Sequence, residues 1–379
     1  MRILMVCPSY QPQAIGCGVG DYTRLLAEQL AAGGDDVEVL CGSGYRGPID
    51  GAVRVRPIVE SWSPWALLRL ATAPASADLI DFQFTPVLYG RHSALRLWPA
   101  LLKLRRRRVP AVVTLHSLSG RSLGSRLAAG LMLLAARGAI GANEEVTAML
   151  ARRAPRLARK TIEVPIGSNV VIAPAAPAEL QAVRAHLGAG PGDPLLAHFG
   201  LVYPGKGLET LFRALGTLRG RHPGARLAIA GETRAESRDY RETLERLAAD
   251  LGVAGAIQWT GRLEPAEVSR LLQAADLYVV PYDGGVSIRR GTLMAGLAHG
   301  LPVISTTPAV PSAHLRDGEN VSLVPPGDPG ALAARLIELV EAPDRRAALG
   351  EGARELAAAF SWPRIAATTR SAFAQVARS

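Results

Sequence analysis

The sequence predicts an α/β protein with two doubly wound parallel sheets, one in each of two domains. Short, almost continuously apolar runs recur along the 379 residues, and each is followed by a turn and a stretch of helical character. Such runs are typical of strands that helices cover on both faces. A chain of this length exceeds one typical core, and the Ala/Pro-rich stretch Ala173–Pro177 separates two series of these runs. We therefore expect domains at 1–170 and 171–362, facing each other across a ligand-binding cleft.

The charge of the chain limits the classes of partner. Its formal net charge is +10, from 43 Lys and Arg against 33 Asp and Glu. This balance favours acidic partners, such as phosphorylated substrates or anionic lipid surfaces. No helix-turn-helix, zinc-finger or RNP-like signature occurs in the sequence, so we expect no nucleic-acid partner.

Cysteine usage and hydropathy point to the cytoplasm. Cys7, Cys17 and Cys41 have no CxxC spacing, which argues against a disulfide framework or a zinc site and suits a reducing compartment. No apolar run reaches the roughly 18 residues that a membrane-spanning helix needs. The apolar run after Arg2 is too short for a signal peptide.

The first series of strands begins with a glycine-bearing turn. Strands are expected at Arg2–Cys7, Val37–Leu40, Val53–Ile58, Leu79–Phe84, Ala111–Leu115 and Ala139–Ala142. The loop Pro8–Asp21 carries Gly16, Gly18 and Gly20, and the helix Tyr22–Ala32 follows with Asp21 as its expected N-cap. Glycines at this place are typical of nucleotide-binding folds. The signal is weak, because GCGVGD is not GxGxxG with an acid about twenty residues later.

A histidine follows one of these strands directly. The apolar run Ala111–Leu115 ends in His116 and Ser117. Ligands of parallel α/β sheets bind beyond the carboxyl ends of the strands. His116 is therefore a candidate for direct substrate contact, and the alternative is a structural histidine.

The second series repeats the pattern with more glycines. Strands are expected at Leu195–Phe199, Arg226–Ala230, Ile257–Thr260, Tyr278–Val280, Leu301–Ser305 and Asn320–Val324. Gly200, Gly231 and Gly261 follow the first three, and Lys206 stands in a glycine-flanked loop before a helix. A cation at a helix start opposes the helix dipole. This favours a phosphate partner for Lys206 over an ordinary surface lysine.

The stretch Tyr278–Thr306 organises the second series. A strand leads to Gly284 and Gly285, then to Arg289 and Arg290, and then to a helix and another strand. Such a loop offers backbone N–H groups and the positive end of a helix dipole to an anion. Two guanidinium groups suit phosphate oxygens. We interpret the stretch as a diphosphate-binding corner, and the alternative is an ordinary turn with two solvated arginines.

The sequence also bears on how a diphosphate leaving group could be neutralised. It contains no Asp-x-Asp, the pattern that holds a divalent metal in many sugar-nucleotide enzymes. Without a metal, cationic side chains and helix dipoles must stabilise the developing charge. Lys206, Arg289 and Arg290 could supply it. We expect neither a metal site nor a cofactor.

Eight segments follow one another over nearly the whole length of the chain: GCGVGDYT, VVTLHS, IEVPIGSN, HFGLVYPGKGLETL, LAIAGE, IQWTGRL, AGLAHGLPVIST and FSWPRIA. In these segments the chain resembles the GT-B glycosyltransferases, most closely the retaining family 4. The resemblance implies two Rossmann-like domains, the first for the acceptor and the second for a nucleotide-sugar donor. It also implies that residues 363–379 form a helix that packs back on the first domain.

The resemblance assigns roles to individual residues. His116 would lie near the donor sugar and Lys206 would contact the diphosphate; with Arg290 they are our catalytic candidates. Expected donor-binding residues are Gly18, Gly200, Lys206, Gly231, Gly261, Gly284, Gly285, Ser287, Arg289, Arg290, Gly291 and Thr292. Expected acceptor-side residues are Gly16, Gly18, Asp21 and Tyr22.

The chain departs from the family pattern at three positions. Counting back from Gly300, the two family glutamates fall on Ser287 and Ala295, and the family arginine five residues before the lysine falls on Leu201. We hypothesise that Arg289 or Arg290 replaces that arginine. Ribose recognition would then need Ser287, Thr292 or backbone groups.

The expected reaction is transfer of a sugar from a UDP- or GDP-linked donor to a hydroxyl acceptor, which could be a glycan, a lipid-linked molecule or a small molecule. The resemblance implies retention of anomeric configuration by front-face attack. The rival hypotheses are a non-catalytic binding protein of the same fold and a sugar-nucleotide epimerase. The basic run Lys103–Arg108 is either a solvated helix end or a contact with anionic lipid headgroups on the inner membrane face.

Overall fold

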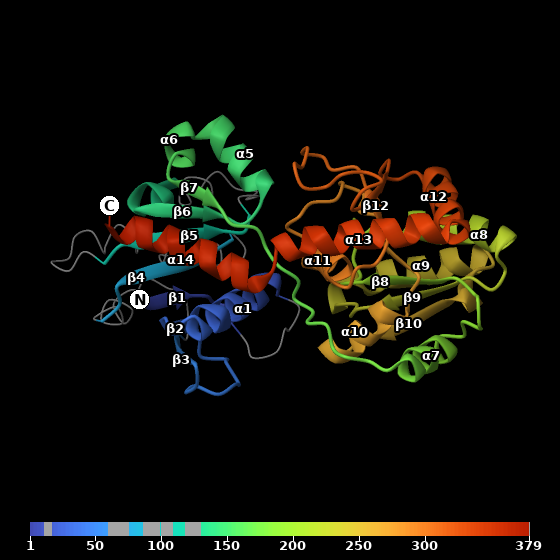
Figure 1. Ribbon diagram of the computed structural model, residues 1–379, viewed down its shortest axis with the longest axis horizontal. Coiled ribbons are helices and arrows are strands. Elements are labelled where there is room, and N and C mark those ends of the chain that lie inside the picture. Colours follow the sequence, from blue (N-terminus) through green and yellow to red (C-terminus); the bar gives the residue numbers. More distant parts are fainter. Residues whose placement is uncertain (11–16, 60–75, 86–98, 100–108, 118–129, 379) are drawn as a thin grey trace. The chain divides into compact units, whose positions relative to one another are not determined.

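The computed structural model describes residues 1–10, 17–59, 76–85, 99, 109–117 and 130–378. The chain forms two compact units (Figure 1). Unit 1 comprises Met1–Gly167 with Phe360–Ser379, and unit 2 comprises Ser168–Ala359. Each unit has its own parallel sheet with helices packed on it, which confirms the predicted fold class.

Among the described residues, unit 1 has a seven-stranded parallel sheet in the order β3-β2-β1-β4-β5-β6-β7. Its strands are β1 (Arg2–Val6), β2 (Asp36–Gly42), β3 (Val53–Val59), β4 (Leu79–Phe84), β5 (Ala111–Leu115), β6 (Gly138–Gly141) and β7 (Thr161–Glu163). Its described helices include α1 (Gly18–Ala32), α5 (Glu144–Arg153), α6 (Pro155–Ala158) and α14 (Trp362–Arg378). The strand order reverses direction between β1 and β4, which makes this the switch point of the sheet.

The strands of unit 1 send alternate side chains to two apolar layers. Ile3 and Met5 pack with residues of α1 and α14 on one face. Leu4 and Val6 pack with residues of α5 on the other. The last helix is joined to the end of α1, because Arg370 donates from Nη2 to the Leu30 carbonyl at 3.1 Å and from Nε to Asp35 Oδ2, just after α1, at 2.6 Å. Residues 362–378 therefore belong to the core of unit 1.

The start of α1 differs from the sequence-based expectation. The helix begins at Gly18 with Cys17 as its N-cap, so Asp21 is not the cap. Gly18 and Gly20 lie in the first turn of the helix, not in a loop. The backbone N–H of Asp21 donates to the Cys17 carbonyl at 3.1 Å. A Cβ atom at Gly20 would lie 2.4 Å from the Ser9 carbonyl oxygen, so this glycine allows the close approach of two backbones.

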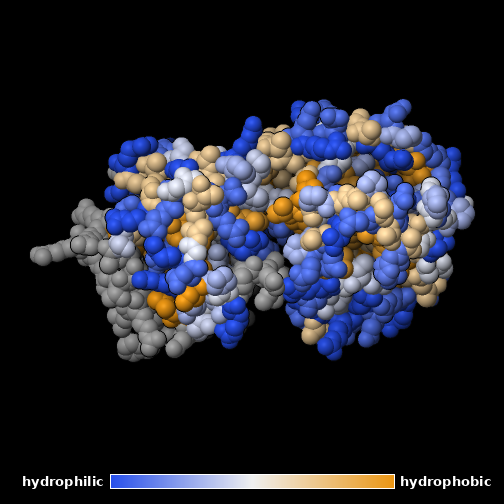
Figure 2. All heavy atoms as spheres, turned by 60° about the horizontal axis from the view of Figure 1, so that its bottom comes forward, coloured by the Kyte–Doolittle hydropathy of each residue, from blue (hydrophilic) through white to orange (hydrophobic). Residues whose placement is uncertain are grey.

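Unit 2 has a six-stranded parallel sheet in the order β10-β9-β8-β11-β12-β13. Its strands are β8 (Leu195–Phe199), β9 (Arg226–Ala230), β10 (Ile257–Gly261), β11 (Leu277–Val280), β12 (Val303–Thr306) and β13 (Ser322–Val324). Its α-helices are α7 (Pro177–His186), α8 (Leu208–Arg221), α9 (Arg238–Asp250), α10 (Pro265–Ala274), α11 (Gly291–Ala298), α12 (Pro329–Glu341) and α13 (Pro343–Ala359). Hydrophilic residues cover most of unit 2 in the face shown in Figure 2.

The core of unit 2 follows from the same alternation. Leu196, Leu277 and Val279 point to a layer shared with α8 and α12, where Phe212 and Leu336 are fully buried. Burying side chains of this size stabilises the fold by about 2 kcal/mol each. This large core fixes the strand ends on which the candidate site stands.

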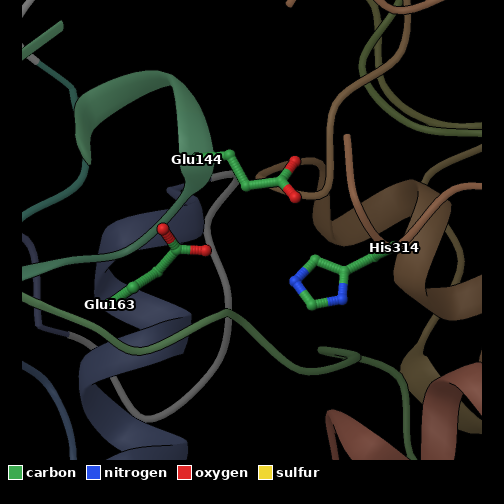
Figure 3. Close-up of side chains that lie close together, drawn as sticks. All are labelled: Glu144, Glu163 and His314. Carbon is green, nitrogen blue, oxygen red and sulfur yellow. The ribbon is translucent and has the colours of Figure 1, made fainter. Parts of the chain in front are cut away.

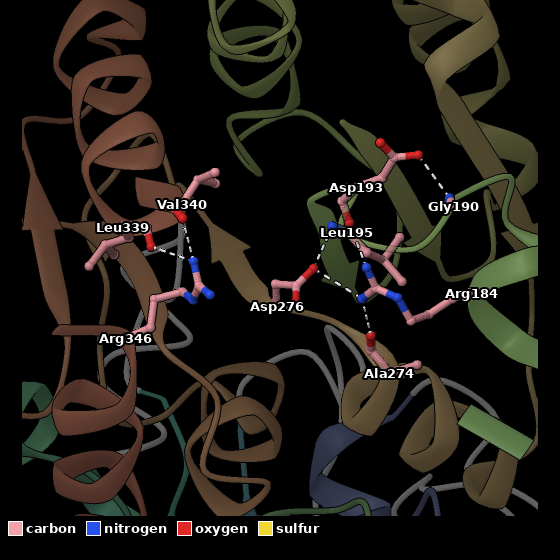
Figure 4. A network of polar contacts seen from close by, with 9 residues as sticks. All are labelled: Arg184, Gly190, Asp193, Leu195, Ala274, Asp276, Leu339, Val340 and Arg346. Atoms are coloured by element: carbon pink, nitrogen blue, oxygen red, sulfur yellow. Dashed lines mark hydrogen bonds and ion pairs between the residues drawn. The ribbon is translucent and has the colours of Figure 1, made fainter. Parts of the chain in front are cut away.

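A polar network closes the amino-terminal edge of this sheet (Figure 4). Arg184 of α7 donates to the Ala274 carbonyl at 2.8 Å, to Asp276 Oδ2 at 3.0 Å and to the Asp193 carbonyl at 2.5 Å. Helix α7 is not predicted from the sequence, because it follows an Ala/Pro-rich stretch. Its start could have been found, since Pro177 stands at the first helical position and Glu179 accepts from the backbone of Ala176.

The Ala/Pro-rich stretch itself is part of unit 2. The backbone N–H of Ala173 donates to Ser269 Oγ at 2.9 Å, and Gln273 Nε2 donates to the Ala173 carbonyl at 2.7 Å. Two hydrogen bonds to α10 therefore hold the segment that composition alone describes as a linker.

Candidate active site

The carboxyl ends of β8 and β11 form the switch point of the unit 2 sheet. From β8 the chain adds strands in one direction, to β9 and β10, and from β11 it adds them in the other. Ligands of open α/β sheets bind in the crevice at such a point. The loop after β8 carries Lys206, and the loop after β11 carries Tyr282. The sequence-predicted diphosphate residues therefore come from the two loops where a ligand is expected.

A glycine allows these two loops to meet. Gly207 has a φ of +70°, and a Cβ atom there would lie 1.8 Å from the Pro281 carbonyl oxygen. Only glycine fits this conformation and this approach. The neighbouring Lys206 is buried, with 5% relative exposure.

Lys206 and Arg290 share one aromatic ring. Lys206 Nζ lies 5.2 Å from the centroid of the Tyr282 ring, and Arg290 Cζ lies 4.7 Å from the same centroid. The centroid of the Tyr203 ring lies 5.0 Å from Lys206 Nζ, and Tyr282 Oη lies 2.5 Å from Thr292 Oγ1. We call these five side chains the basic cluster.

The two cations of the basic cluster influence each other electrostatically. Burial, and then the neighbouring Arg290, lower the pKa of Lys206 to about 8. Arg290 Nε is buried and has no hydrogen-bond partner among the described residues. Buried polar groups are normally hydrogen-bonded, so an unpaired donor beside a second cation indicates a place for an anionic ligand.

The start of α11 adds to this positive potential. Arg290 is its N-cap, and no side chain accepts a hydrogen bond from the first turn at the cap position. Gly291 and Thr292 form that first turn, preceded by the loop with Gly284 and Gly285. The amino end of a helix carries a partial positive charge. The cluster and the helix dipole therefore favour the same kind of ligand.

Three more of the predicted donor residues occupy the same edge of the sheet, whereas Gly18 begins α1 in unit 1. Gly200 and Gly231 follow β8 and β9, and Gly261 ends β10. Their backbones are linked, because Gly200 N–H donates to the Ala230 carbonyl at 2.9 Å and Gly231 N–H donates to the Gly261 carbonyl at 2.8 Å. This row of glycines follows adjacent strands at their carboxyl ends.

The structure separates the two neighbouring arginines. Arg290 lies over the Tyr282 ring. The backbone N–H of Arg289 lies 3.4 Å from Ser287 Oγ, and Ser287 is buried. Arg290 is thus the better candidate to replace the missing family arginine.

One residue of this site is not predicted from the sequence. His198 lies inside β8 and is fully buried. Its Nδ1 hydrogen-bonds the Val279 carbonyl at 2.8 Å, and its Nε2 has no partner among the described residues. Burial, and then Lys206, lower its pKa to about 3, so the ring is neutral beside the lysine. The only signal in the sequence is a histidine within an apolar strand, LLAHF.

Unit 1 places His116 at the carboxyl end of β5, where the sequence predicts it. Its Nε2 lies 2.8 Å from Gln83 Oε1, and its ring meets the edge of the Tyr22 ring at a centroid distance of 4.8 Å. Burial lowers the pKa of His116 to about 3, so the imidazole is neutral at pH 7. Its backbone carbonyl accepts from Asn143 Nδ2 at 3.2 Å.

The expected acceptor-side residues fall on α1. Asp21 and Tyr22 are buried in its first two turns, and Gly18 is its first residue. Tyr22 is the one that touches His116. Gly16 and the basic run Lys103–Arg108 lie outside the described residues.

Three potential metal ligands are drawn in Figure 3, but they do not belong to one unit. Glu144 begins α5 and Glu163 ends β7 in unit 1, while His314 belongs to unit 2. Glu163 Oε2 accepts from Thr147 Oγ1 at 2.7 Å. Within either unit taken alone, the described residues contain no group of three ligands close enough to hold one ion.

Two family models match consecutive parts of the chain. The model for glycosyl transferases group 1 matches residues 181–356, and the model for a glycosyl transferase 4-like domain matches residues 17–175. The chain belongs to the group 1 glycosyltransferases with the GT-B fold. The basic cluster lies entirely within the part matched by the first model, and His116 within the part matched by the second.

Individual group 1 relatives are similar at a moderate level. A D-inositol 3-phosphate glycosyltransferase 2 of Catenulispora acidiphila is 29% identical over 52% of this chain and 47% of that protein. The chain thus spans about half the length of this relative. A phosphatidyl-myo-inositol mannosyltransferase of Mycobacterium leprae is 28% identical over 100% of this chain and 98% of that protein.

Solved structures agree with the fold. HepE of Anabaena, crystallised with UDP and glucose, superposes with a TM-score of 0.78 at 19% identity and covers 99% of this chain and 100% of that one. At such identity the likeness concerns the fold. It confirms the predicted GT-B architecture of two parallel-sheet α/β domains.

The structure locates the two residues, Ser287 and Ala295, that stand where the group 1 family carries glutamates. Ala295 lies inside α11 and is fully buried, and Ser287 precedes the helix. Neither offers a carboxylate. Any ribose contact at these positions must come from a hydroxyl or from the backbone.

Proposed function

We propose that this chain transfers a sugar from a nucleotide-diphosphate sugar to a hydroxyl acceptor. In this proposal unit 2 binds the donor and unit 1 binds the acceptor. The observation that carries it is the basic cluster. Lys206 and Arg290, from loops on either side of the switch point, face one aromatic ring, and Arg290 Nε has no hydrogen-bond partner among the described residues. A nucleoside diphosphate supplies an anion for these groups, and the group 1 family supplies the reaction class.

The same cluster gives the leaving-group chemistry. As the bond between the anomeric carbon and the phosphate oxygen breaks, negative charge grows on the diphosphate. Lys206, Arg290 and the start of α11 would stabilise that charge without a metal ion. Each such donor contributes about 3 kcal/mol to transition-state stabilisation in a buried site. We therefore propose a metal-independent enzyme that needs no cofactor.

The donor and acceptor are proposed as classes. The donor would be UDP- or GDP-linked; HepE of Anabaena was crystallised with UDP and glucose. Two of the relatives are named for inositol 3-phosphate and phosphatidyl-myo-inositol. A polyol that carries a phosphate is therefore the first acceptor class to test. Retention of configuration is proposed from the family resemblance.

The place of action is proposed as the cytoplasm, with contact to the inner membrane face through Lys103–Arg108. No described helix is long and apolar enough to cross a membrane. All three cysteines are free thiols. A lipid-linked acceptor would require such a peripheral contact.

One observation favours the alternative of a binding protein without turnover. Ala295 stands where the family carries a ribose-binding glutamate, and it is fully buried, so no carboxylate can reach the ribose from this position. A protein with this defect could keep the diphosphate site and lose catalysis.

A transfer assay separates the two functions. Labelled UDP- and GDP-sugars are incubated with inositol phosphate and with phosphatidylinositol vesicles, in EDTA and in Mg²⁺. Transfer in both conditions, with the donor's anomeric configuration kept in the product by NMR, supports the proposal. Transfer only with Mg²⁺ contradicts metal independence. Nucleotide binding without transfer or hydrolysis of any donor supports the non-catalytic alternative.

A further inference from the structure

A fully buried polar network lies on one face of the central strands of unit 1. Asp81 and Gln83 of β4 and Thr114 of β5 have no exposed surface. Gln83 pairs with Thr114 in the register of the two strands. His116 follows Thr114 by two residues, so all four side chains point to the same face. The α1 residue Tyr22 packs on this face against His116.

The hydrogen bonds of the network fix the orientation of the Gln83 amide. Gln83 Nε2 donates to Asp81 Oδ2 at 2.5 Å, and Thr114 Oγ1 donates to Asp81 Oδ1 at 2.7 Å. The amide oxygen of Gln83 therefore faces the other way, toward His116 Nε2 at 2.8 Å. An amide oxygen only accepts hydrogen bonds, so Nε2 must be the nitrogen that carries the proton.

The opposite ring nitrogen is then left as an acceptor. A neutral imidazole has one protonated nitrogen and one lone pair, and the partner of the first decides the identity of the second. We propose that Asp81 and Gln83 are positioning residues that hold His116 as its Nε2–H tautomer, so that Nδ1 accepts a hydrogen bond from a hydroxyl of the sugar or of the acceptor. The hydroxyl partner rests on the proposed function, but the tautomer does not.

A purely structural role explains this network poorly. Burying a carboxylate costs more than burying an apolar residue of similar size. The adjacent positions on β4, Phe82 and Phe84, show that this strand accommodates large apolar side chains. The cost of desolvation is visible in Asp81, because burial raises its pKa to about 7. Thr114 can reverse its hydroxyl and accept from a protonated Asp81, so the orientation of Gln83 persists in both states.

Nitrogen-15 NMR of the histidine rings tests the tautomer in the full chain without any substrate. His116→Asn identifies the signals by their loss. In the wild type at pH 7 we expect Nε2 to be protonated, with a proton that exchanges slowly because Gln83 holds it, and Nδ1 to be unprotonated. Protonation at Nδ1 in the wild type would overturn the proposal.

Two pairs of variants separate positioning from folding. Gln83→Met and Asp81→Leu remove an acceptor while filling the space, and we expect the slowly exchanging Nε2 proton to disappear in both. Asp81→Asn keeps an oxygen for Gln83 and should keep that signal. Phe82→Leu changes the opposite face of the same strand and should also keep it. Retention of the protected proton in Gln83→Met would refute the assignment.

Kinetics then test the consequence. Gln83→Met should lower kcat/KM by about 10-fold, which is the usual effect of one lost hydrogen bond to a substrate hydroxyl. Equal kcat/KM in Gln83→Met and wild type would contradict the role of Nδ1. If the NMR result holds but no transfer occurs with any donor, the proposed function fails and the tautomer assignment stands.

Discussion

The two units bury charge in opposite ways. In unit 2, Lys206 and Arg290 stand together, and Arg290 Nε has no hydrogen-bond partner among the described residues. In unit 1, the buried Asp81 has both of its oxygens occupied by Thr114 and Gln83. A buried cation without a hydrogen-bond partner indicates a binding site for an anionic ligand. A buried carboxyl group whose oxygens both accept hydrogen bonds indicates that it orients neighbouring side chains of the protein. This difference assigns binding to the first and positioning to the second.

The largest expected effect concerns Lys206 in the basic cluster of unit 2. Lys206→Met keeps the length of the side chain and removes its charge beside Tyr282. We expect transfer to fall roughly a hundredfold, a loss of about 3 kcal/mol in transition-state stabilisation. Steady-state kcat/KM measures it, with Arg213→Ala on the exposed face of α8 as the matched control. An equal loss of kcat/KM in Arg213→Ala would mean that the net charge of the protein, and not the basic cluster, determines the transfer rate.

The second expectation sharpens the distinction between neighbouring arginines. Arg290→Ala should weaken donor binding about 30-fold, or roughly 2 kcal/mol, which is typical of a lost hydrogen bond to a charged group. Arg289→Ala should have a smaller effect, because Arg290 is the residue over the Tyr282 ring. The dissociation constants of the two variants for the donor distinguish the roles of the two arginines. A larger effect of Arg289→Ala would reverse our assignment.

The third expectation concerns pH. Burial and Arg290 lower the pKa of Lys206 to about 8, and a bound diphosphate must raise it again. Lys206 is therefore charged below pH 8 and loses its proton above it in the free protein. Affinity for a UDP- or GDP-sugar, whose phosphates do not titrate in this range, should be constant from pH 6 to 7.5 and should fall up to about tenfold per pH unit above 8. Calorimetry in buffers of different ionisation heat would also show proton uptake, and Lys206→Met should show neither effect.

The smallest expected effect concerns the buried Asp81 of unit 1. Burial raises the pKa of Asp81 to about 7, so the folded protein holds this proton to higher pH than the unfolded chain. Wild-type stability should consequently fall, relative to Asp81→Asn, as pH rises from about 4 to 7. We expect a difference of about 1 kcal/mol or more between pH 5 and pH 8. Urea unfolding measures it, and a stability difference between wild type and Asp81→Asn that stays constant from pH 5 to pH 8 would contradict the expectation.

The fold, and the places of the main candidate residues in it, could be predicted because both depend on local patterns. Apolar runs mark strands in a parallel sheet, and residues directly after those runs lie at the ligand-binding edge. This rule places His116 directly after β5, and Lys206 lies in the loop between β8 and α8. It cannot separate Arg289 from Arg290, because they are adjacent in the chain and only side-chain packing against Tyr282 distinguishes them.

The contacts that could not be predicted join distant parts of the chain. Gln83 and His116 are 33 residues apart, and no periodicity connects them. His198 looks like part of an apolar strand, and only the neighbouring Lys206 makes it part of the site. The prediction of Asp21 as the N-cap of α1 was wrong for a local reason. Two glycines suggested a loop, although Gly20 lies in the first turn of the helix beside the Ser9 carbonyl.

The most direct test of the account compares nucleoside diphosphates with monophosphates. Dissociation constants of UDP, GDP, UMP and GMP are measured calorimetrically with EDTA, for the wild type, Lys206→Met and Arg290→Ala. We expect one diphosphate to bind the wild type at least tenfold more tightly than its monophosphate, and each variant to lose most of this difference. Equal affinity of the wild type for diphosphate and monophosphate would contradict the claim that the basic cluster binds the diphosphate of a sugar donor.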